Sequence, residues 1–290
     1  MKHAYLIIAH SNFGVLKMLL ESLHTPYNDL FVHIDKKAEV PQWLQHLDWD
    51  NLYVINDRMD VRWGDVSLIK LELYLFEYAY NHGPYEYYHL LSGVDLPIKN
   101  TLYIYNFFHN HRGTEFVGFS SEDESQYKSR VMKYHLFTRY YKVNSLRYIR
   151  SIIELFFNGI VKRKEPEDKK IEYKKGAQWV SITNDFLKYL LSQKEYICDR
   201  YKYTYCADEV FIQTILWNSP FKSHVYSITN EFEGCMRDID WTRGKPYIWG
   251  NDQNDFDILQ NSNKLFARKF DEGVSKQLLE KIQDLWKHNL

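Results

Sequence analysis

Short apolar runs separated by helix-length stretches dominate the first half of the chain. The runs are Ala4–Ala9, Leu30–Ile34 and Leu52–Ile55, and polar residues bound each of them. They lack the strict alternation of a strand that has one face in water. A parallel strand covered by helices on both faces has this pattern instead. The rhythm therefore predicts an α/β fold with a mainly parallel sheet.

The segment from Asp65 to Asn81 is predicted to form the strongest helix. Asp65 can cap its start, no Gly or Pro interrupts it, and apolar residues lie on most of its faces, so we expect it to be buried. Similar patterns predict the remaining elements: strand Tyr87–Leu91, loop Ser92–Lys99, helix Leu102–Asn110, strand Glu115–Phe119, strand Gln178–Ile182, helix Asn184–Ser192, helix Asp208–Trp217, strand Ser223–Ile228 and helix Val274–His288.

Between residues 121 and 175 the alternation of short apolar runs and helix-length stretches is absent. This stretch is predicted to be a basic, mainly helical insertion in one domain that spans residues 1–290, two domains being the alternative. Residues 128–164 carry ten Lys or Arg and one acid, Glu154, among many aromatic and aliphatic side chains. One interpretation is an amphipathic basic helix on an anionic membrane surface. The other is an insertion packed on its own apolar stripe, with a solvated basic face.

Composition narrows the class of protein. The chain of 290 residues has 37 Lys+Arg and 38 Asp+Glu, so its net charge of −1 disfavours a uniformly basic nucleic-acid binder. Aromatic residues make up 17%, which permits stacking on carbohydrate, although core packing explains most of them. Cys198, Cys206 and Cys235 fit neither a disulfide framework nor a zinc knuckle. The run Ala4–Ala9 is too short for a signal sequence or a membrane span, so we expect a cytoplasmic protein.

Polar residues follow three of the predicted strands. His10 follows the first strand, His33 and Asp35 lie at the end of the second, and Ser92 and Asp95 follow the fourth. Ligands of open parallel sheets bind beyond the carboxyl ends of the strands. Asp35 is therefore predicted to bind a nucleotide base, and Asp95 a ribose or sugar hydroxyl. For either residue alone, capping of the next helix is an equally good interpretation.

Phosphate recognition must come from side chains, because the sequence contains neither a P-loop nor a dinucleotide glycine motif. Arg268 and Lys269 stand side by side, Arg243 and Lys245 precede them, and guanidinium groups match phosphate geometry. A solvated basic pair is the alternative. A metal is the weaker interpretation, because Asp-x-Asp pairs are frequent by chance. Three such pairs occur: Asp48 with Asp50, Asp238 with Asp240, and Asp255 with Asp257.

Glu209 is the candidate general base. It stands next to Asp208 at the start of a predicted apolar helix, where the helix dipole favours acids, so a purely structural role is one interpretation. In the other, Asp208 caps the helix while Glu209 faces the cleft and takes a proton from an attacking hydroxyl.

Eight collinear stretches resemble the core-2/I-branching enzymes, glycosyltransferase family 14, which contains β-1,6-N-acetylglucosaminyltransferases and peptide O-xylosyltransferases. The resemblance implies a GT-A-type nucleotide-sugar fold and inverting transfer without a divalent metal or other cofactor. The stretches are HAYLIIAH, VHIDKK, RWGDVSLIKLELYLFEYA, YYHLLSGVDLPIK, KGAQWVSIT, ADEVFIQTIL, RDIDWTRGKPYIW and LFARKFDE.

The resemblance also implies roles for residues. It places a catalytic carboxylate at Glu209, a uridine-contacting acid at Asp35 near His10, and diphosphate-binding cations at Arg268 and Lys269.

Further positions follow from the same stretches. Arg243 lies near a second phosphate-binding arginine of the family, but the local spacing differs, so Lys245 is the alternative. Trp63, in the third stretch, is placed on the donor side. The remaining assignments concern the sugars: Trp179 beside the donor sugar, Trp241 on the acceptor side, and Glu122 or Glu124 as an acceptor-binding glutamate.

The sequence therefore predicts an inverting, metal-independent glycosyltransferase. It would transfer N-acetylglucosamine, as the preferred sugar, from a UDP-sugar to a hydroxyl of a glycan or lipid-linked glycan. Transfer from UDP-xylose and a non-catalytic carbohydrate-binding protein are the alternatives. The cysteine framework, signal anchor and stem of the animal enzymes do not occur here. We therefore expect a bacterial-type enzyme of surface polysaccharide synthesis, cytoplasmic or peripheral at the inner face of the cell membrane, with no nucleic-acid partner.

Overall fold

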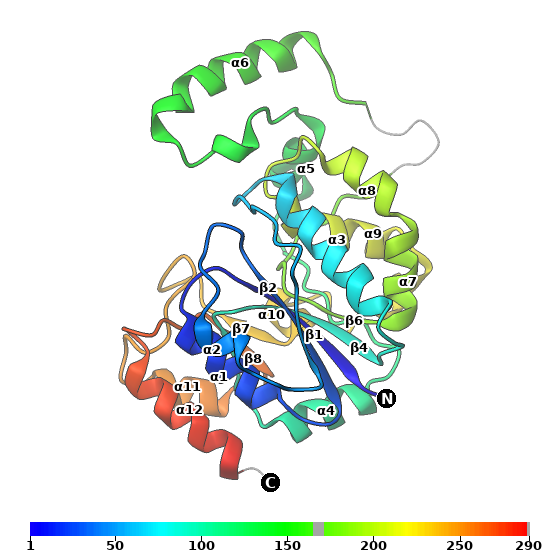
Figure 1. The fold of residues 1–290 in the computed structure, drawn as a ribbon. Coiled ribbons are helices and arrows are strands. Elements are labelled where there is room, and N and C mark those ends of the chain that lie inside the picture. The colour runs from blue at the N-terminus through cyan, green and yellow to red at the C-terminus, as the bar shows by residue number, and fades with distance from the viewer. Residues whose placement is uncertain (165–170, 289–290) are drawn as a thin grey trace.

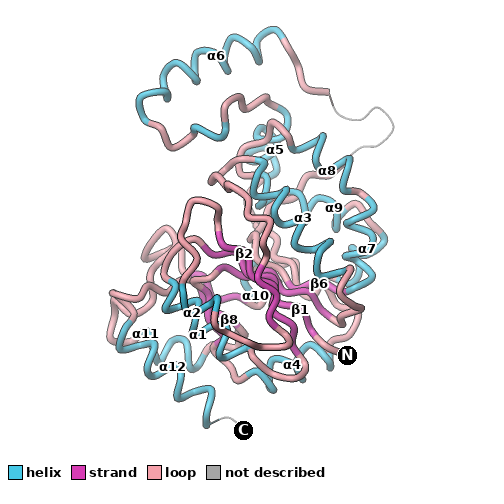
Figure 2. Tube along the Cα trace, in the orientation of Figure 1, coloured by secondary structure: helices cyan, strands magenta, loops and turns pink. Residues whose placement is uncertain are grey.

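A five-stranded sheet lies at the centre of the molecule (Figures 1 and 2). The structure is a computed structural model that describes residues 1–164 and 171–288. The strand order is β3-β2-β1-β4-β6, in which β6 alone runs antiparallel to its neighbour. The mixed, mainly parallel sheet predicted from the sequence is confirmed. Its strands are β1 (His3–Ala9), β2 (Asn28–Ile34), β3 (Leu52–Val54), β4 (Tyr87–Ser92) and β6 (Ser181–Thr183).

The carboxyl ends of the central strands lie level with one another. Ala9 at the end of β1 pairs with Ile34 at the end of β2, and Ile8 pairs with Ser92 at the end of β4. The order of strands reverses between β1 and β4, because the chain builds β2 and β3 on one side before it crosses to the other. Such a switch point leaves a crevice beyond the strand ends where ligands bind.

Helices cover both faces of this sheet. Leu6 and Tyr88 point to one core, while Tyr5 and Ile7 point to the other, as expected when successive side chains of a strand alternate. The first core contains side chains of α3 (Val66–Tyr80), α7 (Asn184–Ser192), α8 (Lys194–Tyr201) and α9 (Phe211–Trp217). The second contains those of α1 (Phe13–Leu23), α2 (Gln42–Gln45), α4 (Thr101–Asn110), α11 (Asp255–Asn261) and α12 (Lys276–His288).

A second, three-stranded sheet joins the C-terminal third of the chain to β5, the strand that follows the carboxyl end of β4. Its order is β5-β8-β7, and in the antiparallel pair of β5 and β8 Asp95 lies opposite Arg268. The strands are β5 (Asp95–Pro97), β7 (Arg237–Ile239) and β8 (Phe266–Arg268), and α10 (Glu231–Cys235) precedes β7.

The insertion is helical in its described residues. It contains α5 (Glu124–Met132) and α6 (Arg147–Ile160), with short 3₁₀ turns at Thr138–Tyr140 and Asn144–Leu146 between them. Figure 1 shows α6 at one end of the molecule, away from the central sheet. In the described residues, no helix has both the length and the apolar character needed to cross a membrane.

The strongest predicted helix is confirmed. It forms α3, and the Asp65 side chain caps it by accepting a hydrogen bond from the Ser67 amide at 3.0 Å. The predicted cap at Asp208 is wrong. Residues Ala207–Glu209 form a separate 3₁₀ turn, and α9 begins only at Phe211 without a side-chain cap.

Two predicted strands are wrong, and one predicted loop contains a strand. Glu115–Phe119 and Ser223–Ile228 contribute only single bridges, in which Glu115 pairs with Val225 and Phe116 with Ser181. The first part of the second segment belongs to a 3₁₀ turn, Pro220–His224. The predicted loop after β4 contains β5, and the strand expected over Gln178–Ile182 is limited to β6.

Glu115 connects the segment Glu115–Phe119, which is not a continuous strand, to β6 through its side chain. Its buried carboxylate accepts hydrogen bonds from the amide, at 2.9 Å, and from the hydroxyl of Thr183. Burial nevertheless raises the pKa of Glu115 from 4.5 to about 7. The folded state therefore binds this proton more tightly than the unfolded chain does.

This pKa shift gives a pH dependence of stability. The free energy of unfolding should fall as the pH rises from about 4.5 to about 7, because the unfolded chain releases the Glu115 proton first. Glu115→Gln keeps the hydrogen-bonding shape without a titrating proton, so its free energy of unfolding should fall less steeply over that range. Urea denaturation at several pH values measures this, with exposed Glu195→Gln as control; identical slopes for wild type and Glu115→Gln would contradict it.

Candidate active site

A cavity of about 440 Å³ lies beyond the carboxyl ends of β1, β2 and β4. Five of the residues predicted from the sequence line it: His10, Asp35, Trp63, Trp179 and Arg268. Its other lining residues are Ile8, Ala9, Lys37, Ala38, Val61, Arg62, Leu68, Ser92, Lys142 and Gln178.

The charged lining of this cavity is strongly biased in sign. Among the described residues, one acid, Asp35, faces four cationic side chains, which are Lys37, Arg62, Lys142 and Arg268. A polyanion such as a nucleoside diphosphate matches this bias, because guanidinium and ammonium groups both bind phosphate oxygens.

Asp35 is fixed at the end of β2. Its buried carboxylate accepts hydrogen bonds from the Lys37 amide at 2.9 Å, from Lys37 Nζ at 2.8 Å and from the Val61 amide at 3.1 Å. Burial opposes ionisation of this carboxyl, but the hydrogen bonds from Lys37 and Val61 outweigh it and hold the pKa of Asp35 below its usual value. Asp35 is therefore an ionised acceptor in a fixed orientation.

Arg268 and Asp95 form a buried ion pair behind the cavity wall. Arg268 Nη1 lies 2.7 Å from Asp95 Oδ1, and the other carboxylate oxygen accepts a hydrogen bond from the Ser92 amide at 2.8 Å. Burial raises the pKa of Asp95, and Arg268 opposes that rise. The guanidinium of Arg268 also lies 4.4 Å from the centre of the Trp179 ring. Asp95 thus orients Arg268 from behind, while Trp179 supports it from the cavity side.

The inserted segment forms part of the cavity rim. Lys142 lies 4.9 Å from the centre of the exposed Trp63 ring. The preceding residue, Tyr141, stacks on Tyr205 with 4.0 Å between ring centres, and Trp63 meets Tyr205 edge-on at 5.5 Å. Residues from the segment before α6 thus close one side of the cavity.

Glu209 lies beside the cavity rather than in its lining. Its carboxylate pairs with Arg130 at 3.0 Å and is about one-third exposed. The carbonyl of Glu209 accepts a hydrogen bond from the Gly176 amide at 2.9 Å, and Trp179 stands three residues further along the chain. Three extended residues span at most about 11 Å. With the 2.9 Å hydrogen bond added, the carbonyl oxygen of Glu209 lies within roughly 14 Å of the Trp179 backbone.

More carboxylates surround Glu209. Glu231 and Glu122 both interact with Lys175, and Glu122 lies 3.0 Å from its ammonium group. Burial, together with the charges of Glu209 and Glu122, raises the pKa of Glu231 to about 7, although Lys175 opposes the rise. Glu124 stands apart from this group on α5, 3.9 Å from Lys128.

The C-terminal cations differ in their surroundings. Lys269 follows Arg268 but does not belong to the described cavity lining. Arg243 is held by two carboxylates, at 2.5 Å from Asp240 in its own loop and 2.9 Å from Asp255 at the start of α11. Lys245 and Trp241 are exposed in the same loop.

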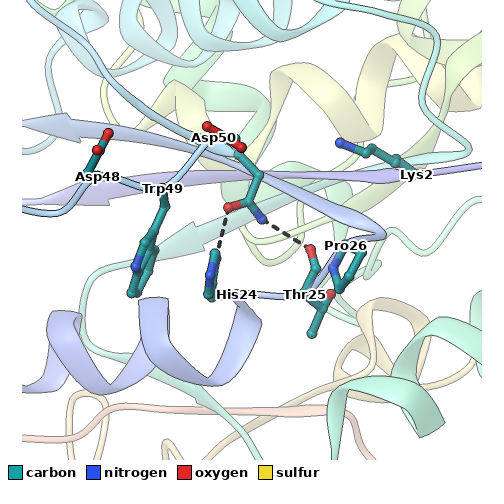
Figure 3. A pocket seen from close by; sticks show the side chains of 8 residues that line it. Lys2, His24, Thr25, Pro26, Asp48, Trp49 and Asp50 are labelled. Atoms are coloured by element: carbon teal, nitrogen blue, oxygen red, sulfur yellow. Dashed lines mark hydrogen bonds between the residues drawn. The ribbon is translucent and has the colours of Figure 1, made fainter.

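Of the residues that the structure describes, none of the aspartates of the Asp-x-Asp pairs lines this cavity. Asp48 and Asp50 line a separate pocket of about 370 Å³ at the amino ends of the strands, where His24 contacts Asn51 (Figure 3). Asp240 and Asp255 are both bound by Arg243. Among the described residues, no three His, Cys, Asp or Glu side chains gather as metal ligands.

Several cavity residues escaped the sequence analysis. Lys37 lies two residues after Asp35, and its closeness in sequence to a predicted site residue could have indicated that it lines the cavity. Lys142 gave no such signal, because it is one of many cations in a basic segment. Gln178 donates a hydrogen bond to the fully buried Glu72 at 2.6 Å, which holds it at the cavity wall. Burial raises the pKa of Glu72 well above its usual value, and the hydrogen bond from Gln178 opposes that rise.

Comparison with known proteins identifies the family. Residues 3–251 match the sequence profile of the Core-2/I-Branching enzyme. The chain belongs to this family. The family predicted from the eight stretches is therefore confirmed, and the glycosyltransferase class expected from the sequence is the class of this family.

The similar curated proteins have low sequence identity to this chain and are longer than it. Rat xylosyltransferase 2 is 24% identical over 303 residues, which cover 96% of this chain and 33% of that protein. Rat beta-1,3-galactosyl-O-glycosyl-glycoprotein beta-1,6-N-acetylglucosaminyltransferase 3 is 24% identical over 315 residues, covering 98% of this chain and 68% of that protein. The chain thus spans about a third of the xylosyltransferases that it matches.

A solved structure also resembles the chain. The apo form of mouse xyloside xylosyltransferase 1 aligns with a TM-score of 0.40 at 12% identity, over 92% of this chain and 96% of that one.

The placement of Arg268 predicts how it acts on a nucleotide. Arg268→Gln should weaken UDP binding by roughly 10- to 100-fold, because a hydrogen bond to a charged group is lost. Uridine lacks the diphosphate, so its affinity should change little. Isothermal titration calorimetry with both ligands measures the two effects.

A matched control separates phosphate binding from loss of an ion pair. Arg112 also pairs with a buried carboxylate, that of Glu86, but it does not line the cavity. Arg112→Gln should leave the affinities for UDP and uridine near those of the wild type. Equal losses of UDP and uridine affinity in Arg268→Gln would disprove a phosphate role for Arg268.

Proposed function

We propose that this protein is an inverting glycosyltransferase that moves a sugar from a UDP-sugar to a hydroxyl group of a glycan. The observation that carries the proposal is the cavity at the strand ends, where Arg268 is held between Asp95 and Trp179 and cations outnumber acids. Membership of the core-2/I-branching family supports the same class of reaction.

The donor site follows from the lining. Uracil would lie near His10 and Asp35, whose ionised carboxylate accepts hydrogen bonds from a base. The diphosphate would lie against Arg268, with Lys269 as the next cation along the chain. The sugar would pack beside Trp179. Trp63 and Lys142 would cover the nucleotide from the rim.

The chemistry requires a base on the side opposite the leaving group. Glu209 accepts the proton of the acceptor hydroxyl, whose oxygen forms a bond to the anomeric carbon. The bond from that carbon to the diphosphate oxygen breaks, and UDP leaves with the electron pair. Attack opposite the leaving group inverts the anomeric carbon and gives a β-linkage. Arg130 lies 3.0 Å from Glu209 and orients the carboxylate.

We propose that cationic side chains stabilise the departing diphosphate without a divalent metal. A fixed charge-stabilising donor contributes roughly 10²–10³ in rate, so Arg268 and a neighbouring cation would supply an effect of useful size. The ion pair with Asp95 supports this role, because it fixes the guanidinium before the donor binds.

The acceptor side is proposed from the residues around Glu209. Glu122, which precedes α5, and Glu124 at the start of α5 offer carboxylates that suit sugar hydroxyls. The exposed Trp241, in a separate loop, offers an aromatic face that suits a sugar ring. N-acetylglucosamine is the proposed donor sugar, with xylose as the second candidate, because the relatives named above include transferases of both types.

The setting is also a proposal. We place the enzyme in the cytoplasm, at the inner face of the membrane, where it would build surface polysaccharide on a glycan or lipid-linked glycan. Cys198, Cys206 and Cys235 are free thiols, which supports a reducing compartment.

The base assignment predicts the effect of one substitution. Glu209→Gln should lower transferase turnover by about 10²- to 10⁴-fold, because the variant has no general base. Its affinity for UDP should stay near that of the wild type, since Glu209 lies outside the donor cavity lining. Release of UDP from a UDP-sugar with a glycan acceptor measures turnover.

Two variants serve as comparisons for Glu209→Gln. Glu195→Gln, on an exposed position of α8, should keep full turnover. Glu231→Gln tests the neighbouring carboxylate: if it abolishes turnover while Glu209→Gln does not, the base is Glu231 and the assignment is wrong. UDP-sugar binding with no turnover by the wild type on any glycan would favour a carbohydrate-binding protein.

The donor and the metal requirement can be tested together. A thermal-shift panel of UDP-N-acetylglucosamine, UDP-xylose and UDP should show the largest stabilisation for the true donor, because a ligand that binds only the folded state raises the unfolding temperature. The shift and the turnover should persist in EDTA. Loss of turnover in EDTA that Mn²⁺ restores would instead indicate a metal-dependent transferase.

A further inference from the structure

Helix α6 packs on the protein through its polar side. Arg150 is buried, donates a hydrogen bond to the Tyr141 carbonyl at 3.3 Å and lies 4.0 Å from the centre of the Tyr141 ring. One turn later, Glu154 lies 3.9 Å from both Arg150 and His135. These contacts place the charged residues of the helix against the segment of the insertion that precedes it.

Asn158 completes this inward polar side. Its amide oxygen accepts a hydrogen bond from the Tyr134 amide at 2.7 Å, and its amide nitrogen donates to the Tyr134 carbonyl at 2.9 Å. Arg150, Glu154 and Asn158 are spaced by four residues, so they lie along one side of the helix.

The opposite side of α6 is apolar and exposed. Leu155 is 78% exposed and Phe156 is 72% exposed, although a soluble helix normally buries such residues. More than half of the large apolar side chains that are exposed in the described chain lie between residues 137 and 161. We call the exposed apolar residues of the helix the α6 face: Tyr148, Ile149, Ile152, Ile153, Leu155, Phe156 and Ile160.

Basic residues border the α6 face. Lys162 and Lys164 are exposed just beyond the end of the helix, and Lys133 is exposed in the segment before it. The one acid of residues 128–164, Glu154, is turned inward. The rim of the apolar face is therefore positively charged.

We propose that the α6 face docks on an anionic membrane surface, with its apolar side chains in the lipid and the surrounding lysines at the headgroups. An amphipathic helix lies in the plane of the interface in this way, and each nearby basic residue adds to the attraction for anionic lipid. The orientation of α6 supports docking on a membrane. Its polar side chains already contact other residues of the protein, which leaves the apolar side chains exposed.

A second copy of the chain fits this face less well. A two-fold interface brings the same patch of both copies together, so the lysines of one rim would meet those of the other. Like charges placed opposite one another oppose association. An anionic surface has the complementary charge.

Docking would place the donor cavity close to the bilayer. Arg150 of α6 contacts Tyr141, and the next residue, Lys142, lines the cavity. The membrane and the nucleotide site thus share one short segment. This geometry is independent of the identity of the donor sugar.

Vesicle co-sedimentation of the full chain tests the proposal. The wild type should bind vesicles of equal parts phosphatidylglycerol and phosphatidylcholine, and bind vesicles of phosphatidylcholine alone much less. The double variant Leu155→Ser with Phe156→Ser should bind the anionic vesicles at least about tenfold more weakly, because it removes two large apolar side chains from the interface. Lys162→Glu with Lys164→Glu should also weaken binding by about tenfold or more.

The matched control lies on α4, which Figure 1 shows at the opposite end of the molecule from α6. Leu102 and Tyr103 are also exposed, at 44% and 52%, so Leu102→Ser with Tyr103→Ser removes similar apolar surface elsewhere. This control should bind vesicles as the wild type does. Unchanged UDP affinity and circular dichroism in every variant would show that the fold and the donor site are intact.

Two results would overturn the proposal. One is equal vesicle binding by the wild type and both α6-region variants. The other is a dimer of the wild type in analytical ultracentrifugation that Leu155→Ser with Phe156→Ser converts to a monomer, with no vesicle binding by either protein. The second result would assign the face to a second copy. Neither result depends on transferase activity.

Discussion

The ion pair between Asp95 and Arg268 is the interaction on which the arrangement of the site depends. Asp95 is almost completely buried, and removal of one partner from a buried ion pair costs about 3–5 kcal/mol. The two residues come from β5 and β8 and face one another in the antiparallel register. The pair therefore joins β5 to β8 and fixes the position of the guanidinium beside Trp179.

The sequence predicted the parts of the fold that rest on long, regular patterns. The strands β1, β2 and β4 and the helix α3 are mainly apolar over five or more consecutive residues, so the sequence predicted them correctly. The strands β5, β7 and β8 are three residues each, which is too short for any periodicity to appear. At Glu115–Phe119 the composition favoured a strand, but a Cβ at Gly118 would lie 2.3 Å from the Glu231 carbonyl. The segment there makes only two single bridges, Glu115 with Val225 and Phe116 with Ser181.

The candidate site was predictable only residue by residue. Family resemblance and strand ends pointed to Asp35 and Arg268, and the structure brings both to one cavity. The contact of Arg268 with Asp95 spans 173 positions of sequence, so no local pattern reveals it. The orientation of α6 could not be predicted from the sequence either. Its periodicity defines an apolar stripe, but only the contacts of Arg150, Glu154 and Asn158 show which side faces the protein.

The tight turn after β4 has a consequence for the fit of a ligand. A Cβ at Gly93 would lie 2.6 Å from the Cβ of Ala9, so the backbone passes from the first sheet to the second in direct contact with the end of β1. Asp35 belongs to one sheet and Arg268 to the other. The close contact between the two sheets therefore sets the separation of these two groups, and a ligand that touches both must match that separation.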